Sequence, residues 1–167
     1  MIKKLLLVIA LVSPMCMTAQ KLGVVDSKAI FDAMPEKVAA EAQLNELMAR
    51  YSEENTKLEK EFNQKYADYQ SLEAETPKSK KARRIQEIQE NQRKISSYQQ
   101  MVEQDMNARR AELLNPIKAR LQSVIDSVGA EGGYSLVFDV SKTPVAFKGA
   151  DVVDITSAVK TRLGIVE

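Results

Sequence analysis

The sequence predicts an α+β fold in which a long antiparallel helical hairpin, a coiled-coil arm, is inserted in a small β-rich oligomerisation head. Two long segments carry apolar residues three and four positions apart, which places those residues on one face of a helix. A short break separates the two segments. Strand-like segments precede the first and follow the second. The head is therefore expected to be assembled from both ends of the chain.

Residues 1–20 are predicted to be a secretory signal peptide. Lys3 and Lys4 give a basic start, an apolar run begins at Leu5, and Ala19 supplies the small residue before a cleavage site. We expect cleavage near Ala19 and a periplasmic mature chain. The apolar run is too short for a membrane span, and the alternative is an uncleaved N-terminal anchor.

Composition argues against most kinds of catalytic and metal site. The chain has no histidine, and its one cysteine, Cys16, leaves with the signal peptide. Thiol chemistry, disulfides, His-ligated metals and Ser-His-Asp catalysis are thereby excluded. The 24 Lys and Arg residues balance 23 Asp and Glu residues, which argues against a nucleic-acid-binding protein. We expect no enzyme, no cofactor and no metal.

The first part of the head is expected at residues 21–35. The residues up to Asp26 are predicted to form a strand, and Asp26 or Ser27 offers an N-cap for a short helix that continues through Met34. Pro35 suits the first turn of the next helix, where its missing N–H group leaves no bond unmade.

The arm is expected over residues 36–128. From Glu36 to Glu75 the chain has neither Gly nor Pro, and a helix of this length gives a rod of about 60 Å. The apolar positions follow a heptad spacing with one polar slot near Asn55. They are Leu44, Leu47, Tyr51, Leu58, Phe62, Tyr66, Tyr69 and Leu72.

A second stripe follows the break, and we place the tip of the arm near residues 76–80. This stripe has polar gaps at Gln92 and at Arg109 or Arg110. Pro116 is expected to kink the helix, and Gly129 is expected to end it with a left-handed cap. The apolar positions are Ile85, Ile88, Ile95, Tyr98, Val102, Met106, Leu113, Ile117, Leu121, Val124 and Val128.

Two matched stripes joined by a short break favour a helical hairpin. Residues 36–75 carry ten acidic and five basic side chains, whereas residues 78–94 carry seven basic and two acidic ones. Opposite charges on neighbouring helices favour one register, although exposed pairs add little stability. The alternative is one continuous parallel coiled coil through Pro77.

The second part of the head is expected at residues 129–167. Strands over residues 134–140 and 145–148 are predicted to form a hairpin. Asp154 is expected to cap a final helix that Gly164 closes.

The head is expected to self-associate. A domain of about fifty residues without a disulfide or metal buries too little surface to be stable alone, and short strands leave unpaired edges. A closed cyclic oligomer is the simplest solution, and the number of copies does not follow from this argument. The residues expected to carry it are Val24, Val25, Leu136, Val137 and Phe138.

Two groups of side chains on the arm are candidate binding residues. Five bases near the tip suit anionic membrane surfaces or acidic protein segments; the alternative is a solvated end partly paired with Glu73 and Glu75. The bases are Lys78, Lys80, Lys81, Arg83 and Arg84. Three methionines suit adaptable apolar contacts; they are Met48, Met101 and Met106.

Other residues that attract attention have structural explanations. The aromatic residues of the first stripe are expected mainly in the seam between the helices, with client contact as the alternative. Asp26, Asp139 and Asp154 are expected to make local hydrogen bonds at strand ends and helix caps and not to form a metal or catalytic site.

Short motifs at both ends of the mature chain stand out. Gly23-Val24-Val25-Asp26 opens it, Leu136-Val137-Phe138-Asp139 follows the arm, and Ala150-Asp151-Val152-Val153-Asp154-Ile155-Thr156 lies near the end. With Pro35 opening the arm, these motifs resemble the Skp/OmpH family of periplasmic chaperones over essentially the whole mature chain.

The resemblance implies a homotrimer in which a β-rich body holds three helical hairpins around a cavity. It further implies that the cavity receives unfolded outer-membrane β-barrel proteins, without ATP, and prevents their aggregation. Family members are usually strongly basic, whereas the positive charge here is concentrated at the arm tip. The alternative function is an envelope adaptor whose coiled coil bridges folded partners.

Overall fold

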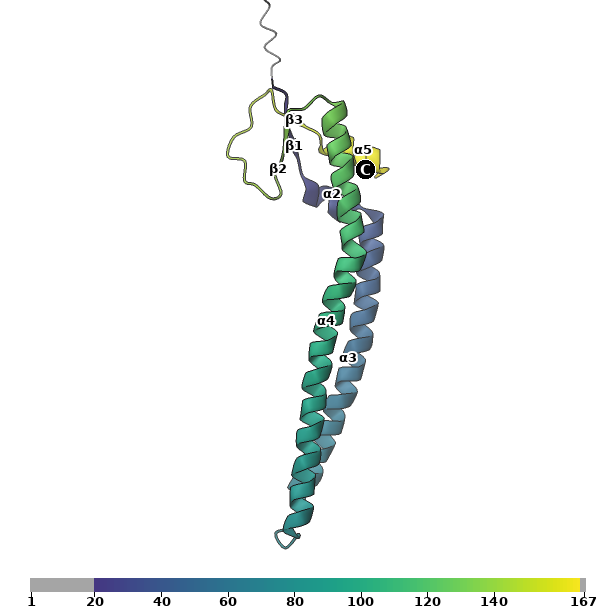
Figure 1. Cartoon of the computed structure of the whole chain (residues 1–167), viewed down its shortest axis with the longest axis vertical. Helices are drawn as coiled ribbons and strands as arrows, with labels where there is room; N and C mark the ends of the chain where they lie inside the picture. Colours follow the sequence, from purple (N-terminus) through teal and green to yellow (C-terminus); the bar gives the residue numbers. More distant parts are fainter. Residues whose placement is uncertain (1–19, 166–167) are drawn as a thin grey trace, which may run out of the picture.

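The protein consists of a long helical arm with a small head at one end (Figure 1). The computed structural model describes residues 20–165, so the expected signal peptide, with its cleavage site near Ala19, lies outside the described residues. The head holds the strands β1 (Leu22–Val25), β2 (Leu136–Asp139) and β3 (Val153–Asp154) and the helices α2 (Ser27–Ala33) and α5 (Thr156–Leu163). The arm consists of α3 (Pro35–Gln70) and α4 (Lys78–Glu131). The α+β prediction is confirmed.

β1 leads into α2 through an aspartate cap. The Asp26 carboxylate accepts a hydrogen bond from the N–H group of Ala29 at 2.8 Å, which satisfies a free donor in the first turn of α2. Pro35 then occupies the first position of α3, where its fixed φ is already helical. The predicted strand, cap, short helix and proline are all present.

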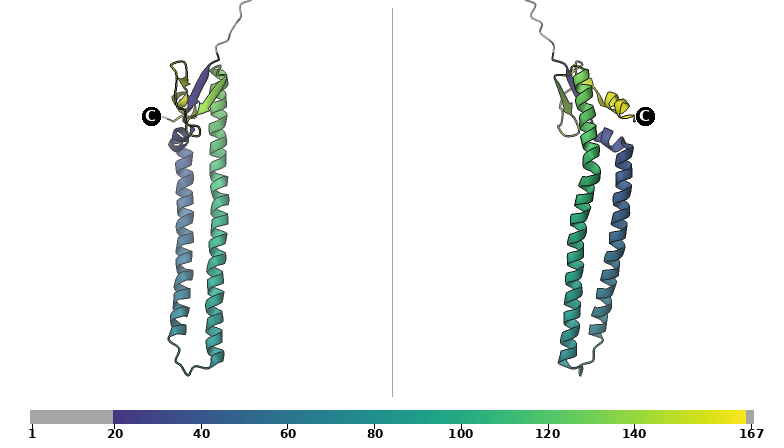
Figure 2. Two further views of the ribbon diagram at one scale, coloured as in Figure 1. Left: turned by 90° about the vertical axis from the view of Figure 1, so that its left-hand side faces the viewer. Right: turned by 45° about the vertical axis from the view of Figure 1, so that its right-hand side comes forward.

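α3 and α4 run antiparallel and side by side along the arm (Figure 2). α3 ends at Gln70, earlier than the expected Glu75. The Ser71 hydroxyl donates to the carbonyl of Asp68 at 2.9 Å and so satisfies an acceptor in the last turn. Residues 71–77 then reverse the chain, and Leu72 falls outside the helical stripe.

α4 is continuous through Pro116 and ends at Glu131. The expected left-handed cap at Gly129 was wrong, because Gly129 is a buried residue inside the helix. A Cβ at this position would meet Val137 at an ordinary contact distance of 3.7 Å, so an alanine would fit and nothing forces the helix to end there. The left-handed conformation occurs at Gly133, with a φ of 66°.

The three strands form one sheet in which β2 and β3 both pair in parallel with the central strand β1. The expected hairpin between residues 134–140 and 145–148 was therefore wrong. β2 pairs with a strand from the other end of the chain, and residues 140–152 form an irregular loop. Parallel neighbours need a long connection, and the whole arm supplies it between β1 and β2.

The two faces of the sheet have different surroundings. Val25 and Val137 face the helices, whereas Leu136 and Phe138 are 49% and 40% exposed. Side chains alternate between the faces of a strand, and Val24 lies opposite Phe138 in the register. We call the face that carries Val24, Leu136 and Phe138 the outer face.

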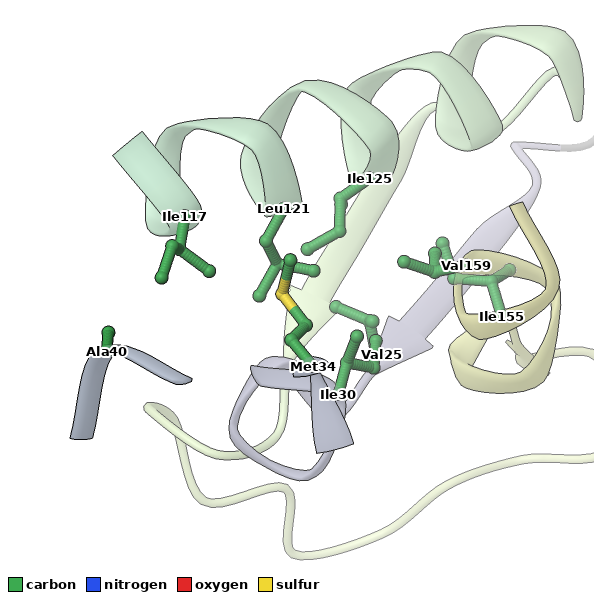
Figure 3. Close-up of a cluster of buried hydrophobic side chains, with 9 residues drawn as sticks. All are labelled: Val25, Ile30, Met34, Ala40, Ile117, Leu121, Ile125, Ile155 and Val159. Atoms are coloured by element: carbon green, nitrogen blue, oxygen red, sulfur yellow. The ribbon is translucent and has the colours of Figure 1, made fainter. Parts of the chain in front are cut away.

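The core of the head lies between the inner face of the sheet and the helices α2, α4 and α5, with the start of α3 at its margin (Figure 3). Its deepest side chains are Val25, Ile30, Met34 and Val159, each at most 2% exposed. Burial of a side chain of this size stabilises the fold by about 1.5–3 kcal/mol. The other members of the core are Ala40, Ile117, Leu121, Ile125 and Ile155.

One residue at each end of the final helix helps to set its bounds. Asp154 accepts a hydrogen bond from the N–H group of Thr156 at 2.9 Å, although the N-cap residue itself is Ile155. Gly164 ends α5 with a φ of 76°, a conformation that favours glycine. Both residues therefore act at the ends of α5, as the sequence predicted.

Candidate functional site

A groove of about 450 Å³ lies along the arm between α3 and α4. The antiparallel pairing brings Tyr51 of α3 against Tyr98 of α4, with ring centroids 6.3 Å apart and ring planes at 79°. This edge-to-face contact is a favoured aromatic geometry. We call the site the arm groove. It is lined by Met48, Tyr51, Ser52, Asn55, Tyr98, Gln99, Val102, Glu103, Met106, Asn107 and Arg110.

Hydrogen bonds fix the two tyrosines in the groove. The Tyr51 hydroxyl donates to the Asp105 carboxylate at 2.6 Å, and the Tyr98 hydroxyl donates to the backbone carbonyl of Tyr51 at 3.4 Å. The bond to Asp105 raises the pKa of Tyr51, and burial raises the pKa of Tyr98. A tyrosine is already uncharged at neutral pH, and both shifts favour the neutral form further. They give the groove a fixed aromatic surface.

The rest of the lining combines apolar and polar groups. Met106 is buried, whereas Met48 is 47% exposed and can repack against a bound group. Glu103 and Arg110 contribute opposite charges to the lining. An apolar surface with a few polar groups suits an aliphatic or aromatic side chain carried on a peptide.

The three methionines predicted as contact residues do not form one site. Met48 and Met106 line the arm groove, but Met101 is 43% exposed and does not line it. Tyr98 and Val102 line the groove as well, although the sequence placed them only in the apolar stripe. Residues at equal distances from the tip meet across an antiparallel hairpin, so an accurate tip position would have paired Tyr51 with Tyr98.

The aromatic side chains of α3 lie partly in the seam between the two helices and partly on the surface of the arm. Phe62 and Tyr66 stack with ring centroids 6.2 Å apart. Phe62 is half-buried, and Tyr66 is 46% exposed. A two-helix arm has too little partner surface to cover every ring in its stripe.

The five predicted bases lie in the first two turns of α4 at the far end of the arm (Figure 1). Arg83 and Arg84 pair with Glu87 at 3.1 and 2.8 Å, and these arginines lower the pKa of Glu87, Arg84 more strongly. Lys81 donates to the backbone carbonyl of Ala74 at 3.0 Å. The ion pairs of the arginines are thus with Glu87 and not with Glu73 and Glu75, the partners considered in the alternative of a solvated end.

Lys78 and Lys80 are exposed, and no acidic residue lies in the first turn of α4. Cations at a helix N-terminus oppose the helix dipole. The position of these bases therefore does not help α4 to form.

The predicted head residues divide between the two faces of the sheet. Val25 and Val137 pack into the head's own core, and Val24 is 3% exposed. Leu136 and Phe138 remain exposed on the outer face. Only these two present a substantial apolar surface to another molecule.

Asp26, Asp139 and Asp154 each make local hydrogen bonds, with Ala29, Ser27 and Thr156 respectively. Among residues 20–165, no group of three His, Cys, Asp or Glu side chains is arranged to hold a metal ion. Over the same range, none of the helices is both long and apolar enough to cross a membrane.

The arm-and-head arrangement is shared with known proteins. The family model for outer membrane proteins of the OmpH-like type matches residues 21–163. The chain belongs to this family. Its members are chaperones and not enzymes, in agreement with a site that is an apolar groove.

Curated relatives cover nearly all of this OmpH-like chain. The chaperone protein Skp of Yersinia enterocolitica is 27% identical over 154 residues, covering 91% of this chain and 93% of the relative. Skp of Pectobacterium atrosepticum is 27% identical over 144 residues, covering 85% and 87%. The crystal structure of an OmpH-like chain from Caulobacter crescentus has a TM-score of 0.69 at 16% identity, covering 86% of this chain and 83% of that one. The structural match establishes the shared fold.

Proposed function

We propose that this OmpH-like chain is an ATP-independent periplasmic holdase, which binds unfolded outer-membrane proteins between its arms and prevents their aggregation. The observation that carries the proposal is the arm groove, an apolar surface on an extended arm in a chain of a chaperone family. The names of the relatives and of the family support the activity and the class of client. The signal peptide expected at residues 1–20 supports the proposed periplasmic location.

Weak, repeated contacts suit this task. Burial of one large apolar side chain contributes about 1.5–3 kcal/mol, so a single groove holds a client segment only briefly. Several arms acting on one client raise the overall affinity by multivalency. The client leaves as it folds into the membrane, because folding buries the apolar side chains that the arms had bound.

The copies needed for multivalency are proposed to associate through their heads. The outer face leaves Leu136 and Phe138 exposed, and all-parallel sheets are generally covered on both faces. A closed ring of heads would cover this face and hold the arms around one cavity. The trimer number rests on the family resemblance. The arm tips, with Lys78 and Lys80 exposed, are proposed to make transient contacts with anionic membrane surfaces.

Met48→Asp tests the groove. A charge at its mouth must be desolvated when an apolar side chain binds, so the affinity for an unfolded barrel protein should fall roughly tenfold. The measurement is light scattering of a urea-unfolded barrel protein diluted into increasing amounts of each variant. Val38→Asp is the matched control, since Val38 is 59% exposed on α3 and does not line the groove.

The wild-type protein should suppress scattering at a stoichiometric ratio, and Val38→Asp should do so equally. If the wild type has no effect on scattering and a folded envelope protein is captured instead, the chain is an adaptor. If both variants act like the wild type, the groove is not the client site.

A further inference from the structure

A second hollow continues the arm groove towards the head. It has a volume of about 370 Å³ and shares Met48, Met106 and Arg110 with the arm groove. The two hollows therefore form one groove on the same side of the arm, which we call the joined groove. The second hollow is lined by Glu41, Leu44, Asn45, Met48, Met106, Arg110 and Leu114.

The joined groove has the length of a short extended peptide. On α3 its lining runs from Glu41 to Asn55, a distance of about 21 Å at the rise of an α-helix. An extended chain covers that distance with about six residues. The side chains of Leu44 and Met106 in its lining are buried and give it an apolar floor. The joined groove can therefore hold several consecutive residues of one chain.

Polar side chains with unused hydrogen-bonding groups line both walls of the joined groove. Within residues 20–165, the side chains of Asn45, Ser52 and Asn107 make no hydrogen bond. An amide and a hydroxyl can each donate and accept. The backbone N–H and C=O groups of an extended segment need such partners, whereas a helix satisfies most of its own and an acyl chain has none. These walls therefore favour an extended peptide as the occupant.

Arg110 is the one basic residue among the described residues that line the joined groove. Its guanidinium makes no hydrogen bond or ion pair within the described chain, although the neighbouring Arg109 pairs with Glu112 at 2.8 Å. Glu41, which lines the same end of the groove, pairs with Lys37 at 2.7 Å. Because a guanidinium can bind a carboxylate through two parallel hydrogen bonds, Arg110 is available to an acid that the occupant carries.

Glu103 restricts the position of such an acid within the joined groove. It lies seven positions from Arg110 on α4, which is about 10.5 Å along the same face of the helix and towards the tip. Its carboxylate makes no ion pair within residues 20–165 and repels an acidic group placed beside it. The complementary occupant therefore carries its acid at the end of the groove nearer the head.

We propose that the joined groove selects an extended client segment in which an apolar side chain lies beside a carboxylate, and that Arg110 recognises the carboxylate. The apolar side chain packs against Met48, Tyr51 and Tyr98, and the acid lies at Arg110. The inference rests on the client binding of the proposed function and adds the kind of segment that the arm holds.

Two labelled nine-residue peptides test the selection by fluorescence anisotropy on the full exported chain. Each has a phenylalanine at its centre, and they differ only in an aspartate or an asparagine two positions later. The wild type should bind the aspartate peptide about threefold to fivefold more tightly, as expected of a solvent-exposed ion pair. High salt should reduce this ratio, because it screens the attraction.

Arg110→Gln should reduce the ratio of the two affinities to about one. Arg109→Gln is the matched control, since it removes the same charge from an exposed neighbour that does not line the joined groove. This control should keep the wild-type ratio. Both arginines are exposed, so circular dichroism should be the same for all variants. An equal loss of the ratio in both variants would assign the attraction to the charge of the whole arm and overturn the role of Arg110.

Suppression of the aggregation of a urea-unfolded barrel protein is measured on the same samples. If the wild type suppresses aggregation but binds the two peptides equally, or binds neither, the inference is overturned and the holdase stands. Discrimination between the peptides without suppression of aggregation supports the selection by Arg110 and overturns the proposed function. Tighter binding of a helix-stapled aspartate peptide, or displacement of the linear peptide by equimolar dodecanoate, makes a helix or an acyl chain the occupant and overturns the inference.

Discussion

Asp139 joins the end of β2 to the start of α2. Its carboxylate accepts hydrogen bonds from the Ser27 hydroxyl at 2.5 Å and from the Ser141 hydroxyl at 2.7 Å. Burial raises the pKa of Asp139, but the bonds from Ser27, Ser141 and Lys142 outweigh it and hold the pKa well below its usual value. The fold therefore favours the ionised carboxylate.

Asp139→Asn should destabilise the head by about 1–3 kcal/mol at neutral pH, because an amide cannot accept the same set of bonds. A carboxyl whose pKa is lowered by folding contributes fully above its unfolded value, near 4, and loses that contribution as pH falls further. The wild type should therefore lose stability below about pH 4 more steeply than the variant. Urea unfolding at a series of pH values, at one protein concentration, measures both effects.

Asp151→Asn is the control, since Asp151 is an exposed residue of the same loop. Equal acid dependence of the wild type and Asp139→Asn would show that this carboxylate does not couple the fold to pH.

At the scale of elements, the seam of the arm contains one buried polar side chain. Asn91 is 2% exposed, and neither polar atom of its side chain has a hydrogen-bond partner in the described chain. The pKa of Glu61 is lowered mainly by its hydrogen bond with Lys65, and the Asn91 amide adds only a small effect. The sequence placed a polar gap at Gln92, which is exposed.

Asn91→Leu should stabilise the arm by about 1–3 kcal/mol, because it removes an unsatisfied buried amide and adds apolar contact. The matched change Asn55→Leu should stabilise the arm less than Asn91→Leu, or destabilise it. It removes the hydrogen bonds that Asn55 donates to Glu59 at 2.6 Å and accepts from Gln99 at 3.4 Å. Urea unfolding followed by circular dichroism gives both values. A loss of stability in Asn91→Leu would mean that the amide specifies the register of the hairpin, as single buried polar residues do in coiled coils.

The elements themselves could largely be predicted because their causes are local. The Asp26 cap, Pro35 at the first turn and the apolar spacing of α3 act within a few residues. The partners of the strands could not be predicted, because β2 pairs with a strand more than a hundred residues earlier. The arm groove depends on the register of two helices, and a tip misplaced by a few residues changes every pair across the hairpin.

At the scale of the whole molecule, the arm separates two kinds of surface. The outer face lies at one end, and the exposed Lys78 and Lys80 lie at the other (Figure 1). Cations at a helix start oppose the dipole, so their position does not stabilise α4, and we propose that it serves a contact with an anionic surface outside the chain. An oligomer held by its heads would present several such tips on one side.

Binding to vesicles tests this contact. Each base is worth roughly 1 kcal/mol at an anionic surface, so the pair Lys78→Ser and Lys80→Ser should weaken binding to phosphatidylglycerol vesicles about tenfold to thirtyfold. Co-sedimentation with the vesicles at low and high salt measures the binding. Added salt should weaken the binding of the wild type, because salt screens the attraction between the lysines and the anionic surface. Lys60→Ser with Lys118→Ser removes two exposed lysines away from the tip and should have little effect. If this control loses as much binding as the tip variant, the attraction belongs to the whole surface and the tip has no special role.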